Sequence, residues 1–146
     1  MRIRWSRVAR WGAWVAVGAL VLAWGLWLAL GRLMDAGCTN RVLDNQPSPD
    51  GHWRAVVFER NCGASTGFST QVSVLAVRAE LRNRAGNLFI ADTDHGAAPS
   101  GRGGGPAVTV QWRSARQLVV RHHPAARVFK AMPSVNGVAV SYRVEP

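Results

Sequence analysis

Residues 138–145, which read VAVSYRVE, place an apolar side chain at every second position. Residues 108–113, which read VTVQWR, show the same alternation earlier in the chain. Successive side chains of a β-strand point to opposite faces, so this period of two predicts two strands that each bury one face. The two segments therefore favour a β-sheet domain with a hydrophobic core.

Further strands are predicted where short apolar runs lie between turn-forming residues, at 52–59, 70–78, 87–91, 117–122 and 127–130. The tetrapeptide Ser48-Pro49-Asp50-Gly51 has the composition of a type I turn. Residues 76–84 allow one or two helical turns. About seven short strands predict an all-β domain, a small antiparallel sandwich or barrel. Its expected aromatic core consists of Trp53, Phe58, Phe68, Phe89, Trp112, Phe129 and Tyr142.

An uncharged run of twenty residues, WGAWVAVGALVLAWGLWLAL, occupies positions 11–30. As a helix it is about 30 Å long, which matches the hydrocarbon core of a bilayer. Four arginines precede it, and arginines gather on the cytoplasmic side of a membrane. We therefore expect a cytoplasmic basic head at 1–10, a transmembrane signal anchor at 11–30, a linker at 31–50 and an exported β domain at 51–146. The expected location is a bacterial inner membrane, with the β domain in the periplasm.

Two other interpretations of the apolar run bear on its role. A cleaved signal peptide is the first, but the apolar core of such a peptide has only about 7 to 15 residues. The second concerns Gly12, Ala16, Ala19 and Ala23, which lie along one helix face and permit a helix-mediated homodimer. An uncleaved anchor remains the expectation, and a helix partner stays open.

Length and charge limit the class of function. The chain has 146 residues and a formal net charge of +10, and it is too short for a large two-domain enzyme. A basic surface attracts anionic lipids, acidic glycans or nucleic acid. Arginine and alanine are abundant throughout, however, as a GC-rich coding sequence would also produce. Because an exported domain meets no genomic DNA, the expected partners are the lipid bilayer and an envelope protein or glycan.

The chain contains two cysteines, Cys38 and Cys62, and both lie on the predicted outer side. They are expected to form a disulfide there, which stabilises a small domain by about 3 kcal/mol when it closes a loop of this length. Lipidation of Cys38 is an alternative, although Asp35 replaces the aliphatic residue of a lipoprotein signal. A redox pair is less favoured because the two cysteines lack a Cys-x-x-Cys spacing.

One segment matches a hydrolase pattern. Residues 63–67, GASTG, fit the Gly-x-Ser-x-Gly motif around Ser65. That motif requires a strand before it and a helix after it in a parallel sheet, whereas a second strand is predicted here. We therefore expect a turn at this position and assign no catalytic residue.

Two further groups suggest metal or ligand binding only weakly. Asp92, Asp94 and His95 precede a glycine-rich loop at 96–106, but they lack the remaining oxygen ligands of a calcium site. We expect turns in which these carboxylates accept hydrogen bonds from the main chain. His122 and His123 are neighbours on a predicted strand and point to opposite faces, so they do not easily share a metal. No metal or cofactor is predicted.

Several segments resemble a family of short, uncharacterised bacterial envelope proteins. They are SPDG at 48–51, AVVFERNCGASTGFSTQVS at 55–73, GNLFIAD at 86–92 and ARVFK at 126–130. The resemblance covers most of residues 38–146, and the residues around Cys62 are its most specific part. It implies an envelope location and a similar fold, with no assigned activity. Where relatives resemble lipoproteins near the first cysteine, this chain has a full membrane span.

The sequence thus predicts a non-enzymatic binding or envelope-interaction domain on a single membrane anchor. Loops on a rigid scaffold usually carry recognition, so the contact surface is expected at 61–68 and 92–105. An inhibitor or immunity-type protein is an alternative, and so is a small envelope hydrolase using Ser65 or a carboxylate. The candidate binding residues are Asn61, Ser65, Thr66, Phe68, Asp92, Asp94, His95 and Arg102.

Overall fold

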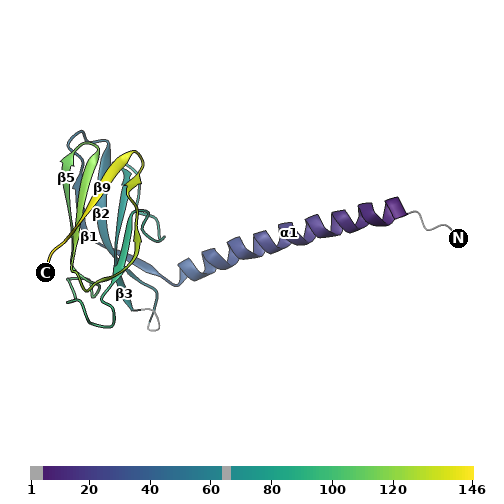
Figure 1. Cartoon of the computed structure of the whole chain (residues 1–146), viewed down its shortest axis with the longest axis horizontal. Helices are drawn as coiled ribbons and strands as arrows, with labels where there is room; N and C mark the ends of the chain where they lie inside the picture. The colour runs from purple at the N-terminus through teal and green to yellow at the C-terminus, as the bar shows by residue number, and fades with distance from the viewer. Residues whose placement is uncertain (1–4, 64–66) are drawn as a thin grey trace. The chain divides into compact units, whose positions relative to one another are not determined.

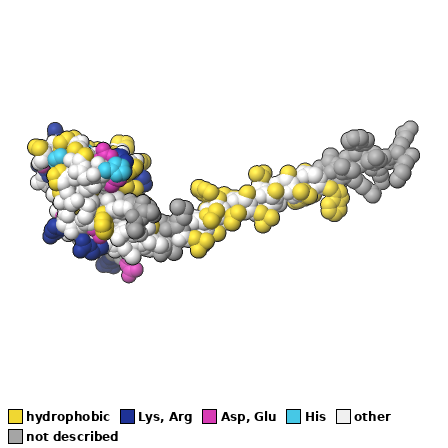
Figure 2. Space-filling view, turned by 90° about the horizontal axis from the view of Figure 1, so that it is seen from below, with side chains coloured by type: hydrophobic (Ala, Val, Ile, Leu, Met, Phe, Trp, Pro, Cys, Tyr) yellow, Lys and Arg dark blue, Asp and Glu magenta, His cyan; other side chains and the backbone are white. Residues whose placement is uncertain are grey.

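The computed structural model of the chain describes residues 5–63 and 67–146. It has two compact units, residues 1–36 and residues 37–146 (Figure 1). In the first unit, helix α1 runs over Trp5–Ala36. Its Trp11–Gly31 segment has a mean hydropathy of 2.1 and is long and apolar enough to cross a membrane. Figure 2 shows hydrophobic side chains exposed along this helix.

The helix continues beyond the predicted span. Residues 31–36 were expected to belong to a linker, but they are the last residues of α1. Leucine, methionine and alanine in this segment are good helix formers, and no proline interrupts it. The linker prediction is therefore wrong for these residues.

The second unit is a two-layered β-sandwich, which confirms the all-β prediction (Figure 1). One sheet has the order β1 (Thr39–Pro47), β2 (Trp53–Asn61), β3 (Phe68–Ala76), β4 (Phe89–Asp92) and β7 (Arg127–Ala131). The other has the order β5 (Val108–Ser114), β6 (Gln117–His122), β9 (Val138–Val144) and β8 (Ser134–Val135). The described residues thus form nine strands instead of about seven. Strands β6 and β9 pair in parallel, whereas the other pairs are antiparallel.

Strand β1 corrects the remainder of the linker prediction. Its sequence, TNRVLDNQP, lacks a regular apolar alternation because it is an edge strand with many exposed positions. Pairing with β2 from Thr39–Asn61 to Pro47–Arg54 holds it in the sheet. Side chains also reach it from elsewhere, since Trp112 Nε1 donates to the Gln46 carbonyl at 2.9 Å. Long-range contacts, and not local sequence, make this segment a strand.

The main core lies between the two sheets. It contains Val57, Val72 and Phe89 from the first sheet and Leu118 and Val120 from the second. The predicted aromatic core is only partly correct. Phe58 and Phe89 are fully buried, but Phe68 is 44 % exposed and Phe129 is 61 % exposed. Phe68 begins its strand and Phe129 lies on an edge strand, so neither position is enclosed by both sheets.

A second buried layer covers the outer face of the five-stranded sheet. Residues 77–87, here called the covering segment, contain turns and bends and not the predicted helical turns. Arg54 Nη2 donates to the Ala79 carbonyl at 2.7 Å, and the Gly86 N–H donates to Gln71 Oε1 at 2.6 Å. Val56 and Phe58 point away from the main core, yet both are 0 % exposed. Strand β2 is therefore buried on both faces, as its continuous apolar run AVVF requires.

The predicted disulfide is present between Cys38 and Cys62. These residues directly flank Thr39 and Asn61, the first pair of the β1–β2 ladder. Asn83 Nδ2 from the covering segment also donates to the Cys38 carbonyl at 2.7 Å. The disulfide therefore links the start of the β domain to the end of β2.

Candidate functional site

The structure divides the predicted binding residues into two groups. Arg102 belongs to the glycine-rich loop, and Phe68 lies beside Gly104 of that loop. Asn61 is the last residue of β2, and its Oδ1 accepts the Gly63 N–H at 2.9 Å. Asp92, Asp94 and His95 lie at the end of β4. Ser65 and Thr66 fall outside the described residues, so the predictions that rest on them stay predictions.

The glycine-rich loop is held against the sandwich. Arg102 Nη2 donates to the Leu43 carbonyl of β1 at 2.9 Å. Gly104 has a φ of +85°, and a Cβ there would lie 2.9 Å from the Phe68 ring. The Thr70 hydroxyl donates to the Pro106 carbonyl at 2.7 Å. Residues 101–106 therefore close one part of the sandwich, so Arg102 and Phe68 already have structural contacts.

A charged cluster forms at the junction of β4 and β7. Arg127 Nε donates to Asp92 Oδ1 at 3.1 Å, and its Nη2 donates to Oδ2 of the same carboxylate. Arg127 Nη1 lies 3.5 Å from Asp94 Oδ1. The Arg127 guanidinium carbon is also 5.0 Å from the centre of the exposed Phe129 ring. We call these four residues, Asp92, Asp94, Arg127 and Phe129, the Arg127 cluster.

Strand register and a tight turn produce this cluster. Asp92 and Arg127 are direct partners in the β4–β7 ladder. The Asp94 N–H donates to Asp92 Oδ1 at 2.9 Å, which confirms the predicted turn. Asp94 and His95 have φ values of 47° and 56°, in the left-handed region that aspartate and histidine tolerate better than most residues. The turn thereby places both carboxylates next to one guanidinium.

The hydrogen bonds and charges around Asp92 and Arg127 keep both side chains charged. Burial raises the pKa of Asp92, but hydrogen bonds from Arg127 and from the Asp94 N–H, together with the arginine charge, outweigh that effect. The pKa of Asp92 therefore lies below its ordinary value of 3.8. The hydrogen bond to Asp92 raises the pKa of Arg127. The contact is an ion pair at neutral pH and remains one well into the acidic range.

Replacing Arg127 by glutamine is expected to lower the melting temperature by a few degrees at pH 7. A carboxyl group with a depressed pKa stabilises the fold above its unfolded pKa, and this contribution disappears as the pH falls through the folded value. The difference from wild type should therefore shrink below about pH 4. Thermal melts at several pH values test this, with Arg78→Gln as the exposed control. A difference that is independent of pH would contradict it.

Arg127 and Phe129 belong to the cluster but are not recognisable as site residues in the sequence. The sequence predicts a strand at 127–130 and places Phe129 in the aromatic core. Arg127 is 35 positions from Asp92, so no local motif joins them. Only the pairing of β4 with β7 could have indicated the contact.

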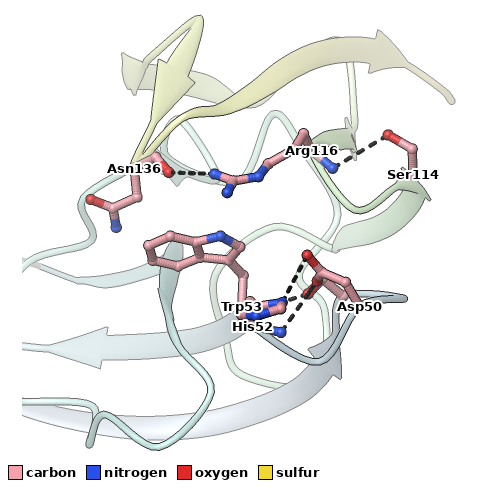
Figure 3. A network of polar contacts seen from close by, with 7 residues as sticks. Asp50, His52, Trp53, Ser114, Arg116 and Asn136 are labelled. Atoms are coloured by element: carbon pink, nitrogen blue, oxygen red, sulfur yellow. Dashed lines mark hydrogen bonds and ion pairs between the residues drawn. The ribbon is translucent and has the colours of Figure 1, made fainter.

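A polar network lies at the start of β2, around Trp53 (Figure 3). The Arg116 guanidinium carbon is 5.8 Å from the centre of the Trp53 ring. Arg116 Nη1 donates to the Asn136 carbonyl at 3.5 Å, and its main-chain N–H donates to the Ser114 hydroxyl at 3.3 Å. The arginine thus connects the β5–β6 and β8–β9 turns to the first residue of β2.

Ser48, Asp50 and His52 lie together in the same region but do not form a hydrolase triad. The Ser48 hydroxyl donates to Asp50 Oδ1 at 2.5 Å, and Asp50 Oδ2 lies 3.1 Å from His52 Nδ1. The carboxylate is therefore in the middle, whereas a triad places the histidine between serine and carboxylate. The hydrogen bond from Ser48 is the main reason that the pKa of Asp50 is lowered. The Gly51 N–H donates to the Ser48 carbonyl at 2.9 Å, so the three residues close the predicted turn.

His122 and His123 border a hollow of about 280 Å³, which Arg121 and Glu145 also line. His122 Nδ1 lies 3.0 Å from the His123 carbonyl and must donate to it. His123 Nδ1 accepts the Ala125 N–H at 3.1 Å. In the part of the chain that is described, no three His, Cys, Asp or Glu side chains are grouped to hold a metal ion.

Comparison of the chain with protein-family models, with curated proteins and with solved structures found no match. The fold and the sites therefore define a class only by architecture. It is a disulfide-linked β-sandwich that follows an apolar helix long enough to span a membrane. The resemblance to bacterial envelope proteins stays a prediction.

Proposed function

We propose that this protein is a membrane-anchored, non-enzymatic binding protein of the bacterial envelope. Its helix holds the β-sandwich at the inner membrane, with the amino terminus in the cytoplasm and the sandwich in the periplasm. The sandwich contacts another envelope protein through the Arg127 cluster. Four arginines before the apolar run support this orientation, since positively charged flanks stay in the cytoplasm.

The arrangement of Arg127 and Phe129 carries the proposal. Arginine and aromatic side chains dominate the binding energy of many protein interfaces. Here two carboxylates and a ring hold the guanidinium in place before any partner binds, while Phe129 remains 61 % exposed. A side chain that is already ordered loses little conformational entropy on binding. The cluster is thus prepared for a contact.

The position of β7 supports the same surface. It is the last strand of its sheet, and in the described residues its outer edge pairs with no other strand. Val128 and Met132 are also exposed here, at 39 % and 43 %. A free strand edge offers main-chain donors and acceptors to a partner. The edge and the Arg127 cluster together provide polar and apolar contacts.

Site-specific photocrosslinking in intact cells tests this function. A photoreactive residue at position 129 of the full chain is expected to capture one envelope protein, and Arg127→Ala should reduce that product by about tenfold. A photoreactive residue at Val77, which is 40 % exposed, provides the control. Identical products from positions 77 and 129, or a product at 129 that is insensitive to Arg127→Ala, would contradict the proposal.

A further inference from the structure

The outer faces of the two sheets differ. The covering segment lies over the five-stranded sheet, whereas the outward residues of the four-stranded sheet are mostly exposed. Strand alternation and the lining of its two hollows assign these outward positions: Thr109, Gln111, Arg113, Gln117, Val119, Arg121, Ala139, Ser141, Arg143 and Glu145. We call this surface the open face. The open face is separate from the Arg127 cluster, which lies on the five-stranded sheet.

The open face is polar and basic. Its described residues include three arginines and one glutamate. Arg121 Nε lies 2.9 Å from Glu145 Oε1, and Arg121 Nη2 donates to Gln111 Oε1 at 2.8 Å. Neither Arg113 nor Arg143 lies within ion-pair distance of a carboxylate among the described residues. Two positive charges therefore remain available to an anionic ligand.

Two shallow hollows border β6 and give the open face an elongated form. One, of about 280 Å³, lies over the small residues Ala139 and Ser141 and is lined by Arg113 and Gln117. The second is the hollow beside His123. Between them β6 extends from Gln117 to His122, which is about 17 Å at the rise of a strand. This form suits a linear chain better than a compact molecule.

The second hollow also has a defined hydrogen-bonding group. His123 Nδ1 accepts a main-chain hydrogen bond, so the proton of the neutral ring is on Nε2. That nitrogen is a donor. Together with the arginine, glutamine, serine and threonine side chains, the face offers mainly donors and hydroxyl groups.

Apolar ligands fit this surface poorly. The large apolar side chains that are exposed in the described β domain are Val42, Phe68, Val77, Val128, Phe129, Met132 and Val144. None of them is among the outward positions of the open face. Acyl chains and apolar peptides therefore find no anchor there, whereas a hydroxyl-rich anionic chain finds both charge and hydrogen-bond partners.

We propose that the open face binds an anionic polysaccharide, a linear glycan with carboxylate or phosphate groups. Arg113 and Arg143 contact its anionic groups, because guanidinium matches carboxylate and phosphate in a paired hydrogen-bond geometry. Gln117, Ser141 and His123 contact its hydroxyl groups. This site is separate from the Arg127 cluster and would operate whether or not that cluster binds a protein.

Binding of the full chain in nanodiscs of zwitterionic lipid tests this proposal. Polygalacturonate supplies carboxylates, phosphomannan supplies phosphates, and dextran is the neutral control. We expect at least one anionic polymer to bind, with an affinity that falls as salt is added. The double substitution Arg113→Gln/Arg143→Gln should weaken binding by about tenfold. The polymer that binds more tightly identifies the preferred anionic group.

A charge-matched variant separates a specific site from general attraction. Arg78→Gln/Arg82→Gln removes two exposed arginines from the covering segment and should leave the affinity within about twofold of wild type. Equal losses in the two double variants would overturn the proposal. So would equally tight binding of dextran or polyglutamate, or no binding of either anionic polymer. Unchanged melting temperatures in both variants ensure that binding, and not folding, is compared.

Discussion

Removal of the Cys38–Cys62 disulfide is expected to lower the free energy of unfolding of the β domain by about 3 kcal/mol. The two cysteines are 24 positions apart, and a cross-link over such a loop restricts the unfolded chain. The native state is affected as well. Strand β1 has largely exposed side chains, so its ladder with β2 and this bridge are its principal attachments.

Cys38→Ser/Cys62→Ser in the full chain measures this effect. The β-sheet signal in circular dichroism during denaturant unfolding in detergent gives the free energy of unfolding. Wild-type protein treated with a reductant is the matched control, and its free energy of unfolding should equal that of the double-serine variant. If the variant had the same free energy of unfolding as the oxidised wild type, the disulfide would contribute nothing to stability.

Gly105→Ala is expected to destabilise the sandwich by about 3 kcal/mol, at the upper end of the range for overpacking. A Cβ at this position would lie 2.6 Å from both the main-chain nitrogen and the hydroxyl oxygen of Thr70. The main chain of β3 cannot move without disturbing its pairs with β2 and β4. The buried hydrogen bond from Thr70 to Pro106 would also be strained.

Gly103→Ala provides the control in the same loop. Its added Cβ would lie 2.8 Å from Glu59 Oε2, 3.0 Å from Leu43 Cδ1 and 3.1 Å from Glu59 Cβ, which are all side-chain atoms and can shift more easily than the main chain of β3. We expect a loss of about 1 kcal/mol there. Denaturant unfolding of both variants tests the difference, and limited proteolysis in membranes replaces it if Gly105→Ala does not accumulate. Equal stability of the two variants would contradict the steric argument.

The strands with one buried face could be predicted from the sequence. Residues 108–113 and 138–145 alternate because one side of each strand meets the core. Strand β1 could not be predicted in this way, since its edge position leaves no regular pattern. Strand β8 has two residues, which is too short for any periodicity. The position of a strand in its sheet and the length of the strand therefore decide whether its sequence shows a regular alternation that predicts it.

The candidate site was only partly predictable. The spacing of Asp92 and Asp94 and the loop that follows them indicate a candidate site, and both residues belong to the Arg127 cluster. Arg127 was not found because strand pairing brings it to Asp92. Phe129 was misassigned because its apolar side chain suggested the core, while a register shift between β4 and β7 accompanies its exposed position.

The sequence by itself determined the long apolar helix, the all-β class and the only possible disulfide within the chain. These follow from composition, local periodicity and the presence of two cysteines. Only the tertiary structure decided which sheet face is covered, which edge is open and which charges meet. Those properties depend on contacts between residues far apart in the chain, such as Arg54 with Ala79 and Asp92 with Arg127. Local sequence sets the helix and the strands with one buried face, whereas contacts with distant segments add the edge strand β1 and set which surfaces remain for binding.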